Sequence, residues 1–172
     1  DRIVWHRSQS HGLPYNGQLH HGVALPIEGP RWVTWDPVHD RVPNRRERLY
    51  GADGTIRKLL AVLRKYRKAN PDAPKVVIGD LSRKGGGPLD AHVSHQNGLD
   101  VDVYYPRLDR KLRDPGTTEH IDLELSQDLV DLFVAAGAQF VFIGYHTPLS
   151  GPRAIVQPYQ NHENHMHVRF RP

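Results

Sequence analysis

The chain has 172 residues and a formal net charge of +4, with 38% hydrophobic and 24% charged residues, an ordinary composition for a globular protein. This length suits one domain with a sizeable core, and no apolar run approaches the roughly 20 residues that a membrane-spanning helix needs. Cysteine is absent, which excludes disulfides and thiolate ligands, so any transition metal must be bound by histidine or carboxylate.

The N-terminal third, residues 1–48, is rich in proline and glycine and holds only short apolar pieces, at 22–25 and 32–35. Because turn-forming residues interrupt every longer run, we expect loops and brief strands that wrap around the rest of the chain. Residues 49–172 are expected to form the catalytic body of a single domain that spans residues 1–172.

The clearest predicted helix covers residues 55–69, where apolar residues recur at three- and four-residue steps and basic residues occupy the opposite face. Thr55 is expected to cap the start of this helix. A second helix is expected over residues 126–136, with Gly137 ending its apolar stripe.

Residue patterns predict strands at 75–78, 99–105, 139–143 and 165–170, whereas residues 148–158 are expected to form a loop. Short strands joined by hairpins and long loops, with two helices on one face, are typical of one fold class. The sequence therefore predicts an α+β fold with a mainly antiparallel central sheet.

Three histidine positions and one aspartate form the candidate reactive constellation. Strand geometry places the side chains of His165 and His167 on one face, and a turn can bring His95 next to Asp102. Three protein ligands with an open fourth position are typical of catalytic zinc, so these residues predict a metallohydrolase. One strand histidine can bind the metal while its neighbour handles protons. A pair of surface histidines without metal is the alternative interpretation.

The chain resembles penicillin-insensitive murein endopeptidases at residues 94–102 (SHQNGLDVD) and at residues 162–169 (HENHMHVR). That family belongs to a wider group of zinc peptidases with the lysostaphin-type peptidases, the D-Ala-D-Ala metallopeptidases and the hedgehog N-terminal domain. The likeness extends from about residue 16 to the end, whereas residues 106–124 and 145–160 resemble no family segment. The absence of cysteine departs from better-known bacterial members, which are held by disulfides.

The resemblance implies a zinc-dependent D,D-endopeptidase that hydrolyses cross-bridge peptide bonds in bacterial peptidoglycan through a zinc-bound water. It implies His95, Asp102 and His167 as zinc ligands, and His165 and His162 as catalytic histidines. It also implies an extracytoplasmic location, in the periplasm or cell-wall space, where peptidoglycan is found.

Three further residues are expected near this site. His92 resembles a family position that supports the site or binds substrate. Asp100 shares a strand face with Asp102, so it can orient a ligand imidazole or remain a solvated carboxylate. Arg83 can bind a substrate carboxylate or remain a surface arginine.

Other functions stay open at the level of sequence. The chain could be a D,D-carboxypeptidase that trims a terminal D-Ala, or a noncatalytic zinc-containing module that binds cell wall or a protein. A metal-dependent nuclease is favoured only by the basic net charge. We expect peptidoglycan as the partner, with no nucleic acid and no transmembrane segment.

Overall fold

A computed structural model describes residues 2–172, so Asp1, the first residue of the predicted N-terminal third, lies outside the described residues. The elements in chain order are β1 (Gln9–Leu13), β2 (Asn16–His20), β3 (Val23–Ala24), β4 (Trp32–Thr34), the 3-10 helix η1 (Arg46–Arg48), β5 (Tyr50–Gly51), α1 (Asp53–Ala69), β6 (Val76–Ile78), β7 (Asp100–Tyr104), the 3-10 helix η2 (Thr118–His120), α2 (Leu123–Ala135), β8 (Phe140–Ile143), β9 (Val156–Pro158) and β10 (His165–Arg169).

The central sheet has six strands in the order β4-β6-β7-β10-β8-β9. Its inner pairs, β6 with β7, β7 with β10 and β10 with β8, are antiparallel. The two outer pairs, β4 with β6 and β8 with β9, are parallel. The predicted α+β fold with a mainly antiparallel sheet is confirmed, and parallel pairing is confined to the edges.

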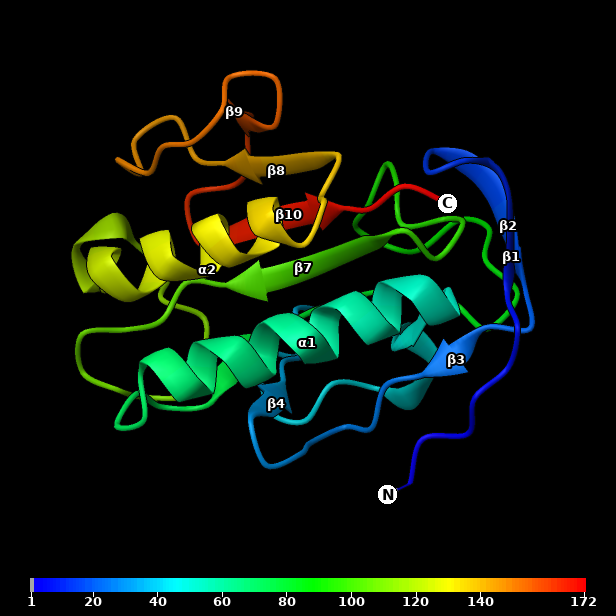
Figure 1. Cartoon of the computed structure of the whole chain (residues 1–172), viewed down its shortest axis with the longest axis horizontal. Helices are drawn as coiled ribbons and strands as arrows, with labels where there is room; N and C mark the ends of the chain where they lie inside the picture. Colours follow the sequence, from blue (N-terminus) through cyan, green and yellow to red (C-terminus); the bar gives the residue numbers. More distant parts are fainter. Residues whose placement is uncertain (1) are drawn as a thin grey trace.

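Both helices cover one face of this sheet, with α1 and α2 side by side in front of β7 and β10 (Figure 1). The apolar stripe of α1 is buried against that face, as its periodicity predicts. The predicted cap at Thr55 is wrong, because the helix begins at Asp53 and Thr55 is buried within its first turn. The hydroxyl of Ser8 accepts a hydrogen bond from the amide of Asp53 instead, at 3.1 Å.

Strands β7 and β10 present their two faces to different environments. Val101 and Val103 of β7, with Met166 and Val168 of β10, belong to the main hydrophobic core beneath the helices. Because side chains alternate along a strand, the histidines of β10 and the aspartates of β7 emerge on the opposite face. The antiparallel register places His167 directly across from Asp102.

Three elements differ from the sequence prediction. The N-terminal third contains a regular hairpin, β1–β2, in which Leu13 pairs with Asn16. The predicted loop at 148–158 ends in β9, whose Val156 is buried beside β8. Helix α2 begins at Leu123 rather than 126, because the side chain of Asp122 accepts a hydrogen bond from a first-turn amide.

The N-terminal third contributes to the same core as the body, since Val23, Leu25 and Trp32 pack in the main hydrophobic cluster. The single-domain organisation and its division after residue 48 stay predictions. Within residues 2–172, neither helix has the length and apolar character needed to cross a membrane.

Candidate functional site

The candidate site lies on the sheet face opposite the helices, where β7, β10 and the long loop between β6 and β7 meet. It opens into a cleft of about 460 Å³ that His92, His162, His165 and His167 help to line. This volume falls within the range of small-ligand and peptide sites in proteins.

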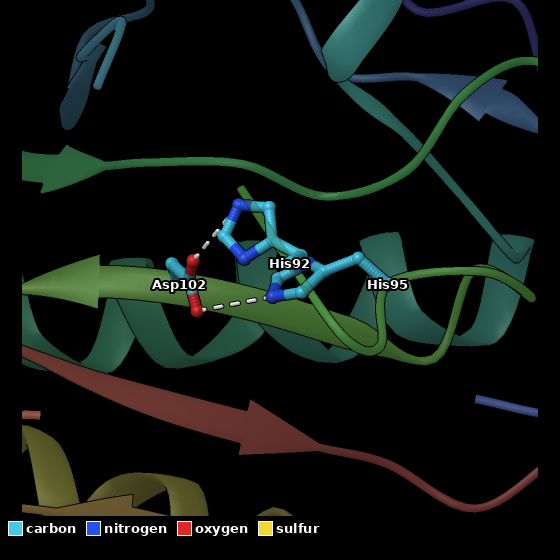
Figure 2. A group of neighbouring side chains, drawn as sticks. All are labelled: His92, His95 and Asp102. Atoms are coloured by element: carbon cyan, nitrogen blue, oxygen red, sulfur yellow. Dashed lines mark ion pairs between the residues drawn. The ribbon is translucent and has the colours of Figure 1, made fainter. Parts of the chain in front are cut away.

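Two hydrogen bonds hold His95 in place, one to a backbone carbonyl and one to the side chain of Asp100. Its Nδ1–H donates to the carbonyl oxygen of Leu81 at 2.6 Å, and its backbone amide donates to Asp100 Oδ2 at 2.9 Å. The residue has a positive φ of 64°, a conformation that non-glycine residues adopt at an energetic cost. Because a carbonyl only accepts, Nδ1 carries the ring proton and Nε2 keeps its lone pair. That Nε2 atom lies 3.2 Å from Asp102 Oδ1 (Figure 2).

His167 faces Asp102 with the other ring nitrogen, because Asp100 lies next to its Nε2. Its Nε2 lies 3.0 Å from Asp100 Oδ1, while its Nδ1 faces Asp102 Oδ1 at 3.6 Å. Asp100 is fully buried and is itself fixed by Arg169, whose Nε donates to Oδ1 at 2.7 Å. The pair forms no well-aligned hydrogen bond, but the buried carboxylate of Asp100 favours the ring proton on Nε2, which leaves Nδ1 on the side of Asp102.

His162 and His165 complete the group of imidazoles. The Nδ1–H of His162 donates to the carbonyl of Gln160 at 2.6 Å, and the Nδ1 of His165 lies 2.7 Å from Asn164 Oδ1. The Nε2 of His165 stands 3.6 Å from Asp102 Oδ1. The rings of His162 and His165 are 4.9 Å apart between centroids, so they form adjacent parts of one wall.

Acceptor atoms therefore converge on one oxygen, Asp102 Oδ1, with the Nε2 of His95 at 3.2 Å and the Nδ1 of His167 at 3.6 Å. Within residues 2–172, His95 Nε2, Asp102 Oδ1 and His167 Nε2 are buried and lack a hydrogen-bond partner. Ligands of a tetrahedral zinc, each 2.0–2.2 Å from the ion, lie about 3.4 Å from one another. The donor types fit a zinc ion, and a cation between His95 Nε2 and Asp102 Oδ1, either a metal ion or a proton on His95, would satisfy both atoms.

The pKa shifts at the site are consistent with a positive charge next to Asp102. Burial disfavours the charged form of His95, but the carboxylate of Asp102 outweighs it and raises the pKa of His95 to about 9. Burial also acts against the charged form of Asp102, yet His95 and His165 hold the pKa of that carboxyl well below its usual range. By contrast, burial lowers the pKa of His165 to about 4 and lowers the pKa of His162 as well. Burial therefore favours the neutral form of both rings.

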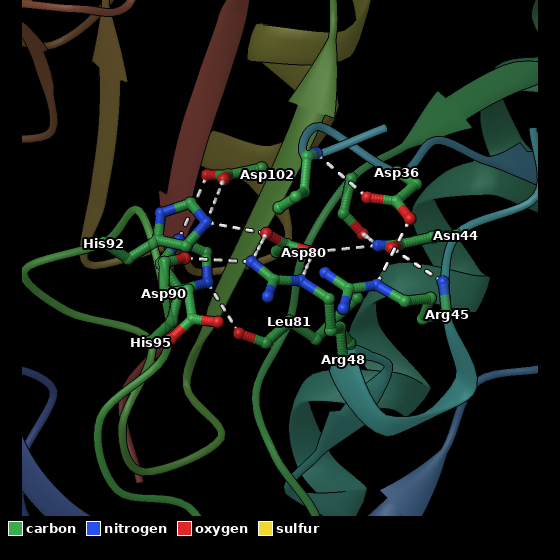
Figure 3. A network of polar contacts seen from close by, with 12 residues as sticks. Asp36, Asn44, Arg45, Arg48, Asp80, Leu81, Asp90, His92, His95 and Asp102 are labelled. Carbon is green, nitrogen blue, oxygen red and sulfur yellow. Dashed lines mark hydrogen bonds and ion pairs between the residues drawn. The ribbon is translucent and has the colours of Figure 1, made fainter. Parts of the chain in front are cut away.

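His92 is drawn away from the other donors by a second carboxylate. Within residues 2–172, the three donors whose ligand atoms all lie within 4.8 Å of one another are His92, His95 and Asp102, a candidate metal group that does not include His167. However, His92 Nε2 donates to Asp80 Oδ2 at 2.7 Å and lies 3.8 Å from Asp102 Oδ2. Asp80 also accepts two hydrogen bonds from buried Arg48, as Figure 3 shows.

Arg83 occupies a different place from the other predicted residues. Its Nε donates to the carbonyl of Pro88 at 2.9 Å, and one guanidinium nitrogen lies 3.8 Å from Asp90 Oδ1. Within the described part of the chain, the residues that line the cleft do not include Arg83. A contact between Arg83 and substrate stays a prediction.

Several residues that support the site escaped the sequence analysis. Two of them had a detectable sequence signal. Asp80 follows a buried strand, and Arg169 lies two residues after His167, on the same strand face. Asn164 and Asp114 carried no comparable signal, because their contact joins residues 50 positions apart. The cleft walls also include Tyr15, from the unpredicted hairpin.

This α+β fold places imidazoles and carboxylates beside a cleft of about 460 Å³. Such groups can bind a metal ion and transfer protons, which are the functions that a hydrolase needs. A sequence model for penicillin-insensitive murein endopeptidases matches residues 10–131, more than half of the chain. The chain belongs to this family, and it is a peptidase of the kind that acts on peptidoglycan. The matched range includes His92, His95 and Asp102, and it ends within α2 before the histidines of residues 162–167. Among curated proteins, no match to this chain was found.

Proposed function

We propose that this protein is a zinc-dependent D,D-endopeptidase that hydrolyses cross-bridge peptide bonds in peptidoglycan. The observation that carries the proposal is that His95 Nε2 and His167 Nδ1 lie 3.2 and 3.6 Å from the buried oxygen Asp102 Oδ1. Family membership supplies the substrate class. Because peptidoglycan lies outside the cytoplasmic membrane, we infer that the protein works in the periplasm or cell-wall space.

His95, Asp102 and His167 would hold the ion. When bound, zinc supplies an acidified water and polarises the scissile carbonyl. His162 and His165 line the cleft beside these three residues. Since burial favours the neutral form of both rings, each could accept a proton at Nε2 and return it to the leaving amine.

The choice of His167 over His92 as the third ligand can be tested by matched substitutions. We expect His167→Gln to lose stoichiometric zinc, because glutamine cannot replace the Nδ1 lone pair at this position. We expect His92→Gln to retain zinc, because its amide can still donate to Asp80. Zinc content after dialysis against metal-free buffer measures both. The reverse pattern would assign the ion to His92, His95 and Asp102.

Activity is tested on purified crosslinked muropeptide dimers, with products identified by mass spectrometry. The zinc-loaded protein is expected to convert dimers to monomers, and the chelator-treated protein to leave them intact. His165→Ala should retain zinc but lose at least about 100-fold in rate, since a positioned general base contributes that much. His146→Ala, which removes an imidazole that is 84% exposed, is the matched control.

The products separate the alternative functions. Release of only a terminal D-Ala would establish a D,D-carboxypeptidase in place of the endopeptidase. Stoichiometric zinc with no cleavage of dimers or monomers would refute the enzymatic proposal and favour a zinc-containing module that binds wall or protein.

A further inference from the structure

A chain of hydrogen bonds runs from the loop after β7 to the imidazole of His165. Asn164 Nδ2 donates to Asp114 Oδ2 at 3.0 Å, and the other end of that amide, Oδ1, lies 2.7 Å from His165 Nδ1. Asp114 belongs to the stretch between β7 and η2, which resembles no family segment in sequence. The structure therefore connects this stretch to the reactive wall of the cleft.

The chemistry of Asp114 fixes the direction of every bond in this chain. A carboxylate can only accept, so the nitrogen end of the Asn164 amide must face it. The amide oxygen then faces His165, and an amide oxygen also only accepts. His165 must consequently carry its proton on Nδ1, which leaves the lone pair on Nε2. That Nε2 atom faces the site, 3.6 Å from Asp102 Oδ1.

Asp114 is itself braced by its own loop. Its Oδ1 accepts a hydrogen bond from the amide of Gly116 at 2.7 Å. Its backbone carbonyl accepts one from Arg107 Nη1 at 3.2 Å. Arg107 in turn donates from Nε and Nη2 to the two carboxylate oxygens of Asp109, at 2.8 and 2.6 Å. The carboxylate that sets the direction of the chain is therefore a fixed part of the fold.

We propose that Asp114 and Asn164 are positioning residues that hold His165 in its Nδ1–H tautomer, so that His165 Nε2 is the proton acceptor in peptide hydrolysis. This inference rests on the proposed function. His165 Nε2 takes a proton from water as the water oxygen bonds to the scissile carbonyl carbon. The same proton passes from Nε2 to the amine nitrogen as the carbon–nitrogen bond breaks, and the ring returns to its neutral Nδ1–H form.

The tautomer can be read without any turnover. In protein labelled with ¹⁵N-histidine, two-bond ¹H–¹⁵N correlation spectra show which ring nitrogen carries the proton. We expect Nδ1–H for His165 in the metal-free wild type, and loss of that single tautomer in Asn164→Ala. Glu119→Gln, on an exposed residue of the same loop, should leave the signal unchanged. An Nε2–H signal in the wild type, or an unchanged tautomer in Asn164→Ala, would overturn the proposal.

Exchanging the side chains of Asp114 and Asn164 should restore the His165 tautomer, which would not be expected if the two residues only stabilised the fold. In Asp114→Asn the oxygen of the introduced amide keeps the hydrogen bond from Gly116, so its NH2 faces Asn164 and the direction of the chain is no longer the one that favours Nδ1–H on His165. In the double variant Asp114→Asn/Asn164→Asp, the carboxylate moved to position 164 accepts from the amide at position 114 and from His165, and the tautomer is restored. This pair also provides a test if Asn164→Ala fails to fold. A double variant no better than Asp114→Asn would contradict the proposal.

Kinetics on muropeptide dimers complete the test. For Asp114→Asn we expect kcat to fall roughly 10- to 100-fold, with KM and zinc content unchanged, because only proton transfer is impaired. The double variant should recover most of this loss. A wild type with the Nδ1–H tautomer but no cleavage would remove the proposed function while leaving the hydrogen-bonded chain established. Cleavage by Asp114→Asn at the wild-type rate would remove the positioning role alone.

Discussion

The tautomer of each imidazole at this site is fixed by the group on its far side. The carbonyl oxygen of Leu81 fixes a proton of His95 on Nδ1, whereas the carboxylate of Asp100, 3.0 Å from His167 Nε2, favours the proton of His167 on that nitrogen. Two rings of the same chemical type thus offer different nitrogens to the same carboxylate, Asp102. Orientation by these outer partners determines whether the site can bind a cation at all.

Asp100 is the residue at which this orientation can be tested. Asp100→Asn replaces an acceptor of His167 Nε2–H by an amide that can present either end to the ring. We expect zinc affinity to fall roughly 10- to 100-fold, the usual effect of losing such a partner. Competition with a chelator of known affinity measures the change. Asp131→Asn, on an exposed helical residue, should bind zinc as the wild type does, and equal affinity in the two variants would contradict the role of Asp100.

The sequence predicted which of these residues lie on one sheet face better than how their rings are oriented, and their roles stay predictions. Strand alternation was enough to place His165, His167 and Asp102 on one face, because that period is a local property of the backbone. The partners Leu81 and Asn164 could not be predicted, because one acts through a backbone carbonyl and the other through an amide that has no local signal. Such contacts depend on how distant elements pack.

At the scale of elements, the β1–β2 hairpin is attached to the loop that carries His95. The amide of Gln96 donates to the carbonyl of Pro14 at 2.9 Å, and the hydroxyl of Ser10 donates to the carbonyl of Asn97 at 2.7 Å. This attachment places the hairpin tip, with Tyr15, at the wall of the cleft. The hairpin therefore belongs to the site rather than to an unrelated N-terminal wrap.

Tyr15 is expected to contact substrate, because its ring is 55% exposed and lines the cleft. Tyr15→Ala should reduce kcat/KM on muropeptide dimers roughly 3- to 10-fold, the range expected for loss of about 1 kcal/mol of aromatic contact. Leu13→Ala removes a similarly exposed side chain from the same hairpin, outside the described cleft lining, and should have no effect. Equal losses in the two variants would indicate a general effect on the hairpin.

The helices and inner strands were predicted because their periodicity is strong, whereas the hairpin and β9 were not. Strand β2 has one buried residue, Leu19, and β9 has one, Val156. A single apolar residue gives no alternation to read, and the pairing of such strands is decided by their neighbours. Parallel pairing at both sheet edges is equally invisible in a local pattern.

The buried ion pair between η1 and the end of β6 makes stability depend on acidity. Burial raises the pKa of Asp80, but hydrogen bonds from Arg48, His92 and Asn44 outweigh it and lower the pKa to about 2. Because this folded-state pKa is below the unfolded value, the stabilisation is present above about pH 4 and is lost as pH falls to 2. Its size is about 2 kcal/mol.

Denaturant unfolding of the metal-free protein between pH 4.5 and 2 measures this loss. The double variant Arg48→Met/Asp80→Asn lacks both the titrating carboxylate and its buried partner charge, so it should lose about 2 kcal/mol less than the wild type over the same range. Parallel pH profiles for the two proteins would show that Asp80 carries no such stabilisation.

For the whole molecule, the candidate ion would add a further link between segments that strand pairing and the ion pair of Arg169 with Asp100 already join. Its expected ligands come from the loop before β7, from β7 itself and from β10 near the other end of the chain. Without metal, the buried His95 Nε2 and Asp102 Oδ1 face each other at 3.2 Å, and Asp102 raises the pKa of His95 to about 9. Because the ion would bind these residues together only in the folded state, metal affinity adds to the free energy of unfolding.

Removal of metal should therefore lower the melting temperature of the whole domain. With free zinc at about 100 times its dissociation constant, the folded state gains about 2.7 kcal/mol, which corresponds to roughly 5–10 °C for a protein of this size. Calorimetry of the zinc-loaded and chelator-treated protein measures the shift. In His167→Gln the two melting temperatures should coincide, because the variant lacks a ligand. A wild-type melting temperature that does not respond to zinc would argue against a metal centre that links these three segments.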